Sequence, residues 1–465
     1  MRRALTLPWM SRTSAGRAPE PFSPLATCEW EMSAPRDVPL YPTWPAEPVV
    51  FDAAIVLVRL HGDPLGCVRV PVAPPREPGE AGCAEGAAIA AAVARDGVLQ
   101  AAVKRHRTCG GCSSVAEGPC WVAARAPGPA LSVEVIVPTA GRQRQLRRAL
   151  ESLQQLTAGS LSLTVVDNHP SDGGATRAVV DAFADARHPV RYVAEPRRGS
   201  SIARNAGVLH SRAEIVAFTD DDVVVDPEWC DWLVEPFRAD PLVGATTGLV
   251  MPMHLETPAQ LLFESYAGFG KGFARQTFDL GPNRADRRLL YPYWGAVFGS
   301  GNAMAFRRST YLVLHGLDPS LGAGSPARAG SDIEALSRVV LAGERIVYEP
   351  RSLCWHEHRR SEAAFARQVR SYGIGLGAIL TKSAITNPAV LALAGRTLVR
   401  RIRGADTPEF AAVAAPRLVD APLPPRYRRS ERLGMALGPL YWARSLCWAH
   451  LKGLHRTMDA HEPRG

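Results

Sequence analysis

Alternating strand and helix patterns between residues 132 and 222 constrain the fold of this chain most strongly. Short runs rich in Val, Ile and Leu, the pattern expected of buried strands, occupy residues 133–137, 162–166, 190–193 and 214–219. Segments with helical spacing separate them, at residues 142–156, 175–186 and 201–211. Strands that alternate with helices across short connections predict an α/β fold, with a mainly parallel sheet covered on both faces. Ligands bind such sheets beyond the carboxyl ends of the strands.

Acidic residues stand at two of these strand ends. Asp167 follows the second strand, and Asp220, Asp221 and Asp222 follow the fourth. Three adjacent carboxylates beside a buried strand repel one another, which raises their pKa values unless a positive group joins them. A divalent cation such as Mn²⁺ or Mg²⁺ would satisfy them. The alternative is a helix cap, supplied by Asp222 or Asp226 before Pro227.

Six short motifs occur in a fixed order along the central part of the chain: VEVIVPTAGR, VVDN, EPRRGSSIARNAG, FTDDD, GSGNAMAFRR and GSDIE. Together they resemble the family 2 nucleotide-sugar glycosyltransferases, which have the GT-A fold. The resemblance covers residues 132–385. It implies an enzyme that moves a hexosyl or related group from a nucleoside diphosphate sugar to an acceptor hydroxyl, with inversion at the anomeric carbon.

The resemblance also implies roles for residues on the donor side. It places seven residues near the nucleotide, the diphosphate or the sugar: Pro138, Thr139, Asp167, Arg198, Arg204, Asp220 and Asp221. Asp222 is the expected metal ligand of the D-x-D motif, and His356 is a second candidate ligand. Asp167 could instead be a turn residue, and the two arginines could be solvated on the surface.

On the acceptor side, the resemblance assigns Asp332 as the base. Glu334 is the reserve, because Ser331 stands where the family usually has Glu, and helix capping is the alternative for Asp332. Three residues, Trp294, Gly301 and Asn302, are expected near the sugar and acceptor, although Trp294 could belong to the core. Residues 257–281 are either a mobile acceptor-side element or a helix packed in the core.

Residues 1–131 form a separate N-terminal module of unknown role. We expect an irregular first 48 residues, strands at 49–60 and 66–72, and a helix at 81–103. The spacing of His106, Cys109, Cys112 and Cys120 permits a zinc site, and free thiols are the alternative.

Residues 386–465 carry 13 basic and six acidic side chains, which accounts for +7 of the total charge of +9. Helices are predicted at 389–403 and 432–454. Apolar and aromatic residues with basic flanks favour a helix on an anionic membrane surface, or a helix packed on the catalytic domain. A general nucleic-acid binder is not indicated, since the charge is confined to this part.

The sequence shows no signal peptide pattern and no long apolar run, so we expect a cytoplasmic enzyme, peripheral on the inner face of the membrane. The acceptor is expected to be a glycan, a lipid-linked intermediate or a small molecule, in cell-envelope or glycolipid synthesis. Two alternatives remain open. One is a catalytically degenerate nucleotide-sugar-binding protein, and the other is a different metal-dependent transferase that acts on nucleotides.

Overall fold

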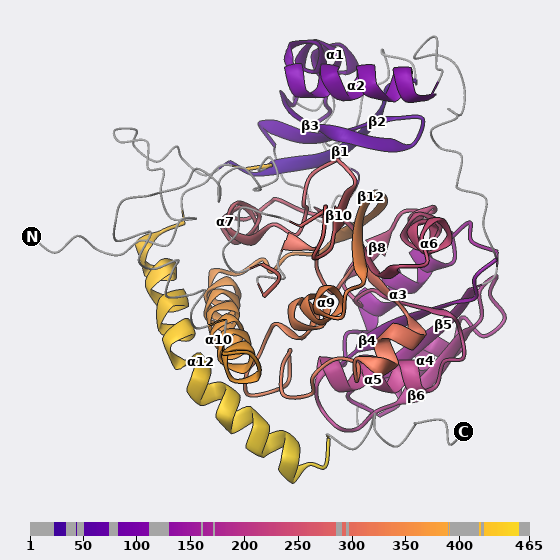
Figure 1. The fold of residues 1–465 in the computed structure, drawn as a ribbon. Coiled ribbons are helices and arrows are strands. Elements are labelled where there is room, and N and C mark those ends of the chain that lie inside the picture. The colour runs from indigo at the N-terminus through magenta and orange to yellow at the C-terminus, as the bar shows by residue number, and fades with distance from the viewer. Residues whose placement is uncertain are drawn as a thin grey trace, which may run out of the picture.

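The computed structural model shows two sheets with their helices and a C-terminal pair of long helices that pack against each other (Figure 1). The structure describes these residues: 23–33, 43, 51–73, 82–110, 130–159, 161–170, 173–284, 291–293, 297–388, 390, 418–419 and 423–454.

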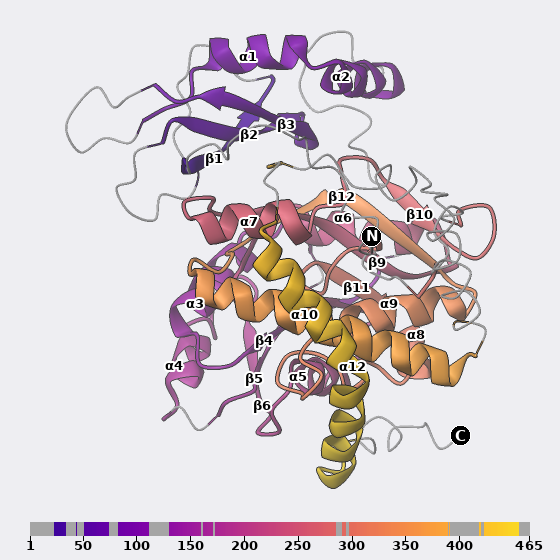
Figure 2. The same cartoon turned by 90° about the vertical axis from the view of Figure 1, so that its left-hand side faces the viewer.

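The N-terminal module is a three-stranded sheet with two helices on one face (Figures 1 and 2). Its strands are β1 (Leu25–Glu31), β2 (Ala53–Leu60) and β3 (Asp63–Pro71), and its helices are α1 (Gly86–Arg95) and α2 (Gly97–Gly110). Strand β1 departs from the irregular structure expected of the first 48 residues. It pairs in parallel with β2, whose first partner residue, Ala53, is distant from Leu25 in the sequence, so no local turn signal marks it.

This module rests on the larger part of the chain. The amide of Leu25 donates to the carbonyl of Leu255 at 3.0 Å, and the hydroxyl of Thr27 donates to the carbonyl of Met253 at 2.7 Å. Arg59 Nη1 pairs with Asp226 at 2.7 Å, just beyond the acidic cluster. The module is therefore tied to the same part of the molecule as the predicted site.

The central sheet has nine strands in the order β10-β12-β9-β11-β7-β4-β5-β6, with β8 paired to β12. Strands β6, β5, β4 and β7 are parallel, as expected from residues 132–222. Beyond β7 the sheet is mixed, because β11 runs antiparallel to both β7 and β9. The strands are β4 (Val133–Thr139), β5 (Leu161–Asp167), β6 (Val190–Ala194), β7 (Ile215–Phe218), β8 (Val223–Val225), β9 (Val243–Pro252), β10 (Gln276–Phe278), β11 (Met304–Arg307) and β12 (Arg345–His356).

Helices cover both faces of this sheet, so its strands are apolar on both sides. Along β4, Val135 and Val137 belong to the core under α3, α4 and α6, whereas Ile136 belongs to the opposite core under α5 and α9. The helices of this part are α3 (Gln143–Leu153), α4 (Ala175–Asp181), α5 (Ser200–Leu209), α6 (Trp229–Ala239), α7 (Pro258–Ala267), α8 (Arg308–Val313) and α9 (Ser331–Leu341). This is the two-face coverage that the alternation of strands and helices predicted.

Two long helices follow, α10 (Glu362–Thr386) and α12 (Pro425–Leu451), and they lie side by side in both views (Figures 1 and 2). Helix α12 begins seven residues before the predicted start at 432. The helix predicted at 389–403 lies outside the described residues, apart from residue 390. Within the described chain, each helix taken singly is too short or too polar to cross a membrane, although α1 with residues 97–106 meets that criterion as a pair bent by 92°.

Candidate active site

The carboxyl ends of β4, β5 and β7 bring the predicted donor-side residues to one edge of the sheet. Thr139 ends β4, and its hydroxyl donates to Asp221 Oδ2 at 2.7 Å. Pro138 precedes it on the same strand and is half-buried. The acidic cluster begins two residues after β7 ends at Phe218. The parallel half of the sheet therefore gathers residues separated by about eighty positions.

The three carboxylates of the cluster have different partners. Asp221 accepts from Thr139 and from Arg142 Nη1 at 2.9 Å, and burial together with neighbouring Asp222 raises its pKa to about 7. Arg142 Nη1 also donates to Asp222 Oδ2 at 2.6 Å. Burial opposes the ionisation of Asp222, but the positive groups around it hold its pKa below the ordinary value. Asp222 is thus a buried, ionised carboxylate.

Helix capping does not explain Asp222. The N-cap residue of α6 is Glu228, which makes no side-chain cap bond. It is Asp226 whose Oδ1 accepts from the Glu228 amide, at 3.0 Å, so the capping role falls to that residue alone. Asp222 Oδ1 instead faces His356 Nε2 across 3.5 Å.

Arg204 lies inside the site rather than on the surface. Its side chain comes from α5, is buried, and pairs through Nη2 with Asp220 Oδ1. Its Nε is buried and has no hydrogen-bond partner within the part of the chain that the structure describes. Burial and the nearby carboxylates of Asp222 and Asp332 raise the pKa of Asp220 despite this pair. Arg198 is exposed in the turn before α5.

Asp167 is fully buried at the end of β5 and makes the turn contact that was its alternative role. Its Oδ1 accepts from the His169 amide at 2.9 Å, and its Oδ2 accepts from the Tyr192 hydroxyl at 2.9 Å. The neighbouring Asn168 accepts from the amide of Gly199 at 2.7 Å, which fixes the start of α5. Gly199 has a φ of 147°, a conformation that favours glycine.

His356 ends β12 and forms a buried pair with His358. The two Nδ1 atoms lie 2.8 Å apart, and His358 Nε2 lies 2.9 Å from Glu264 Oε2 on α7. Burial lowers the pKa of His356 to about 3, so the imidazole is neutral near pH 7 and can bind a metal. Helix α7 is packed in the core, with Phe263 and Glu264 buried, which favours that interpretation of residues 257–281 over a mobile element.

Asp332 stands in the first turn of α9 and contacts the Gly-rich turn at residues 299–302. Its Oδ2 accepts from the amide of Gly301 at 2.8 Å, and a Cβ at Gly301 would lie 2.9 Å from that oxygen. The N-cap of α9 is Gly330, without a side-chain bond, so Asp332 is not the capping residue. Gly301 lies just before β11, whose first residue, Met304, pairs with Phe218 at the carboxyl end of β7, so Asp332 lies near the acidic cluster.

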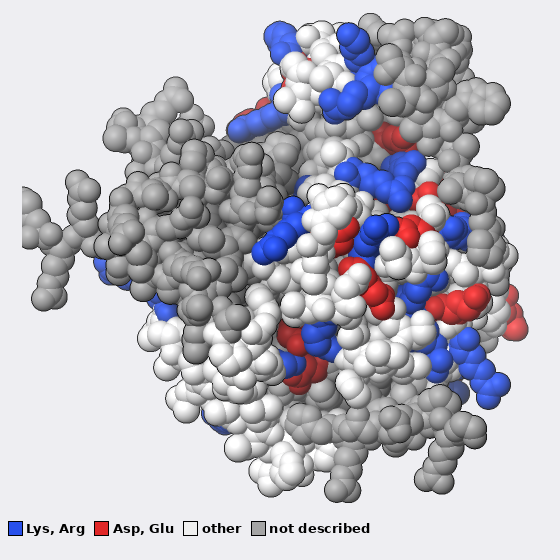
Figure 3. Space-filling model, in the orientation of Figure 1, with Lys and Arg blue, Asp and Glu red and all other residues white. Residues whose placement is uncertain are grey.

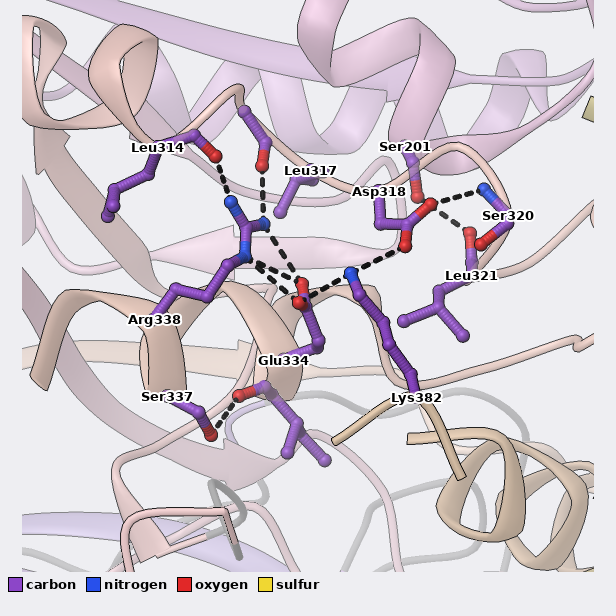
Figure 4. Close-up of polar contacts among 12 residues, drawn as sticks. Ser201, Leu314, Leu317, Asp318, Ser320, Leu321, Glu334, Ser337, Arg338 and Lys382 are labelled. Atoms are coloured by element: carbon purple, nitrogen blue, oxygen red, sulfur yellow. Dashed lines mark hydrogen bonds and ion pairs between the residues drawn. The ribbon is translucent and has the colours of Figure 1, made fainter. Parts of the chain in front are cut away.

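Glu334, the reserve base, is held by two cations instead. Its carboxylate pairs with Lys382 Nζ at 2.7 Å and with Arg338 Nη2 at 2.9 Å, and Lys382 also pairs with Asp318 at 2.6 Å. Figure 4 shows this network, in which Arg338 also bonds the carbonyls of Leu314 and Gly316. The network joins α9 to α10, so Glu334 has a structural role.

Of the remaining acceptor-side residues, the structure describes Asn302 but not Trp294. Asn302 is buried, and its Oδ1 accepts from the Ser300 hydroxyl at 2.6 Å. Trp294 lies outside the described residues. Its neighbour Tyr293 accepts from Asn387 Nδ2 at 2.7 Å, next to the end of α10.

Sequence reasoning missed three residues of the site. Arg142 bridges Asp221 and Asp222, Arg359 lies 4.0 Å from Asp222, and Glu264 bonds His358. Arg142 follows the carboxyl end of β4 by three residues, a position that marks it as a candidate. Glu264 carries no local signal, because its partner is 94 residues away.

The predicted zinc site falls largely outside what the structure describes. Cys112 and Cys120 are in undescribed residues, as is the side chain of Cys109. His106 Nδ1 lies 3.4 Å from Asp63 Oδ2 within the N-terminal module. Among described residues, no three or more His, Cys, Asp and Glu side chains converge as a group that could hold a metal ion.

Charge is interspersed around these elements. On the face shown in Figure 3, acidic and basic side chains alternate over the surface rather than separating into two regions.

Comparison with known proteins identifies the central part of the chain. Residues 134–311 match the sequence model of the family described as Glycosyl transferase family 2. This part of the chain is a family 2 glycosyltransferase domain. It contains Thr139, Asp167, Arg204 and the acidic cluster, and it ends before Asp332 and His356.

Curated proteins similar to this chain are named as glycosyltransferases. The pre-mycofactocin glycosyltransferase of Mycobacterium tuberculosis (strain CDC 1551 / Oshkosh) is 26% identical over 57% of this chain, which spans about half (51%) of that protein. The glucosyl-dolichyl phosphate glucuronosyltransferase of Haloferax volcanii is 24% identical over 49% of this chain and 69% of its own length. Among solved structures, the chain is similar to the mannosyltransferase PcManGT from Pyrobaculum calidifontis in complex with GDP-Man and Mn²⁺. That match has 20% identity and a TM-score of 0.42, and covers 70% of this chain and 89% of the other.

The residues present fit a divalent cation. Asp222 Oδ1 and His356 Nε2 face one another, and carboxylate with imidazole is a donor set that suits Mn²⁺. Two protein ligands do not fill the coordination sphere of such a cation. At nucleotide-binding sites, substrate phosphates and water commonly supply the other ligands. Arg204 Nε, which has no hydrogen-bond partner among the described residues, supplies a further buried donor for an anionic ligand beside them.

Proposed function

We propose that this chain transfers a sugar from a nucleoside diphosphate sugar to an acceptor hydroxyl and that it uses Mn²⁺ or Mg²⁺. One observation carries the proposal: Asp222, His356, Arg204 and the Asp332 carboxylate lie at or near the acidic cluster that follows β7. The first three suit a metal-bound diphosphate, and the fourth suits a base.

The residues divide the chemistry between the two substrates. Asp222 and His356 would hold the cation, which stabilises the charge that develops on the leaving diphosphate. Arg204 would bind a phosphate oxygen through Nε while Nη2 stays on Asp220. Asp332 would take the proton of the acceptor hydroxyl through Oδ1, since Oδ2 is held by the amide of Gly301. A single base and a single displacement imply inversion at the anomeric carbon.

For the acceptor, we propose a lipid-linked or envelope glycan, reached from a membrane surface. Helix α12 exposes Leu433, Leu440 and Leu451, and basic residues accompany them. This face points away from α10, which the opposite side of α12 contacts. The relative from Haloferax volcanii is named for a lipid-linked acceptor, which supports the same class. The enzyme would act in the cytoplasm, on the inner face of the membrane.

The first test of the proposed function is donor binding. Thermal unfolding would be followed with UDP, GDP, dTDP and CDP, each with and without Mn²⁺. We expect a rise in Tm with one nucleotide that needs the metal, because a ligand bound to the folded state alone stabilises it. Transfer would then be assayed with sugars of that nucleotide.

Two variants make the test specific. Asp222→Asn should abolish the metal-dependent rise, since it removes the charge that binds the cation. Asp231→Asn is the matched control, because Asp231, on α6, is an equally buried Asp whose Oδ2 accepts from the Thr157 hydroxyl. A nucleotide-dependent rise without transfer to any acceptor would favour the catalytically degenerate binding protein, and a rise that survives Asp222→Asn would contradict the metal site.

A further inference from the structure

A buried chain of polar side chains extends from Asp222 into the core beneath α7. His356 Nε2 faces Asp222 Oδ1, the Nδ1 atoms of His356 and His358 lie 2.8 Å apart, and His358 Nε2 lies 2.9 Å from Glu264 Oε2. The exposed fractions of His356, His358 and Glu264 are 8%, 2% and 7%. The chain thus links the candidate metal ligand to a carboxylate on another element.

The contact between the two Nδ1 atoms constrains where the protons lie. One nitrogen must donate and the other must accept. If His358 Nδ1 donated, His358 would be an imidazolium, because its Nε2 must also carry a proton toward Glu264. His356 Nδ1 would then accept, and a neutral His356 would carry its proton on Nε2. That proton would face Asp222 and prevent Nε2 from binding a cation. If His356 donates, its Nε2 keeps a free lone pair.

A neutral His358 that donates from Nε2 to Glu264 has its lone pair on Nδ1. It therefore accepts from His356 Nδ1, which is the arrangement that leaves His356 Nε2 free. Hydrogen bonds in such a chain polarise one another when water is excluded. With one proton on His356 Nδ1 and one on His358 Nε2, the lone pair of His356 Nε2 is available to the cation.

The surroundings hold this arrangement rigidly. The Phe263 ring lies 4.5 Å from the ring of His358, and the Phe269 ring lies 5.1 Å from that of His356. Gln260, in the capping box that starts α7, donates to the carbonyl of His358 at 3.5 Å. Helix α7 therefore fixes both the carboxylate of Glu264 and the loop that carries His358.

We propose that Glu264 and His358 are positioning residues that hold His356 in the tautomer whose Nε2 binds the divalent cation. The proposal rests on the proposed function, because it deepens the role of the same metal site. It goes beyond the ligands themselves, since neither residue touches the cation. Outer partners of metal-bound histidines commonly change metal affinity by about 10- to 100-fold when replaced.

The test measures binding of Mn²⁺ alone to the full chain, by the electron paramagnetic resonance signal of free Mn²⁺. His358→Phe keeps a ring among Phe263 and Phe269 but removes the acceptor, and should weaken binding by about tenfold or more. His358→Asn places an amide oxygen near the position of Nδ1, and should restore most of the affinity. Glu264→Gln removes only the charge, and should give an intermediate loss.

Two further measurements separate positioning from general stability. Pulsed resonance of bound Mn²⁺ should show coupling to an imidazole nitrogen in the parent chain, and His356→Ala should remove it. Glu256→Gln is the matched control, because Glu256 is a buried carboxylate near α7 that pairs with Arg360 and not with His358. It should leave the affinity unchanged.

The outcomes distinguish this proposal from the proposed function. Equal Mn²⁺ affinity of His358→Phe and the parent, with the nitrogen coupling intact, would overturn the positioning role and leave the metal site standing. Absence of nitrogen coupling in a parent chain that binds Mn²⁺ would overturn it as well. Absence of any Mn²⁺ binding would overturn both, and His356→Ala would then change nothing.

Discussion

At the residue scale, neighbouring acids on one helix have separate roles. Asp332 and Glu334 are two positions apart in the first turn of α9, and the sequence left open which of them is the base. The structure joins Asp332 to the Gly-rich turn near the acidic cluster, whereas Glu334 is surrounded by Lys382 and Arg338. Two residues of separation turn a side chain by about 200° around a helix, so the two acids face different surroundings.

Replacing each acid should therefore have a different effect. Asp332→Asn should lower kcat by about 10²- to 10⁴-fold, since it removes the general base, and should leave nucleotide binding intact. Glu334→Gln should change kcat little, but should cost about 1–3 kcal/mol of stability, because the half-buried Arg338 loses its carboxylate partner while Lys382 keeps Asp318. Transfer rates and urea unfolding of both variants check this. The reverse pattern would make Glu334 the base.

At the element scale, close packing of α12 on α10 depends on glycines. A Cβ at Gly377 would lie 2.3 Å from the carbonyl oxygen of Met435, and one at Gly438 would lie 2.4 Å from the Cα of Gly377. The helix backbones touch at these positions, which side chains would prevent. Nearby, the Tyr266 hydroxyl of α7 donates to Glu431 of α12 at 2.5 Å, which joins a third helix.

Glu431 should make the stability of this helix packing depend on pH. Burial raises its pKa from 4.5 to about 7, so the folded chain binds its proton more tightly than the unfolded chain does. Its contribution is complete below about pH 4.5 and is lost as the pH rises through 7. Relative to Glu431→Gln, the parent should lose up to about 3 kcal/mol over this range.

Urea unfolding of the parent and of Glu431→Gln at several pH values between 5 and 8 measures the difference. Glu362→Gln is the control, because Glu362 pairs with Arg426 at an exposed site on the same helices. Curves for the parent and Glu431→Gln that stay parallel across this range would show that Glu431 does not titrate in it.

At the scale of the whole molecule, three parts of the chain surround one sheet edge. The N-terminal module is attached beside the acidic cluster through Arg59 and Asp226, and α10 with α12 lies beside α7 and α9 (Figure 2). The exposed side of α12 is the surface that we propose contacts a membrane. Its apolar residues recur at helical spacing, with Leu433, Leu440 and Leu451 on it.

This surface predicts binding to anionic membranes. The double variant Leu433→Asp with Leu440→Asp should reduce flotation with phosphatidylglycerol vesicles at least tenfold, since each leucine inserted contributes roughly 1.5–3 kcal/mol. Val313→Asp is the control, because Val313 is also an exposed aliphatic residue but lies on α8. Surface variants are preferable to truncation, which would uncover α10. Equal flotation of the parent and the double variant would remove the membrane proposal.

Local patterns were enough to predict the strands at residues 133–137 and 214–219, the acidic cluster and the long C-terminal helix. Each depends on neighbouring residues, because about ten consecutive residues are enough to show an apolar face or a polar strand end. They were not enough to reveal β1, which needs β2 as its partner, or Arg142, whose role depends on carboxylates 79 and 80 positions away.

The sequence by itself determined that the middle of this chain is a covered α/β sheet with a carboxylate cluster at its edge. The tertiary structure alone decided which acid of α9 faces that edge and that Glu264 reaches His356 through His358. It also decided that Arg204 is buried with an Nε that has no hydrogen-bond partner among the described residues. The physical reason is distance along the chain. A pattern of hydrophobicity indicates whether a residue is buried. Which residue it contacts depends on how the sheet and helices pack.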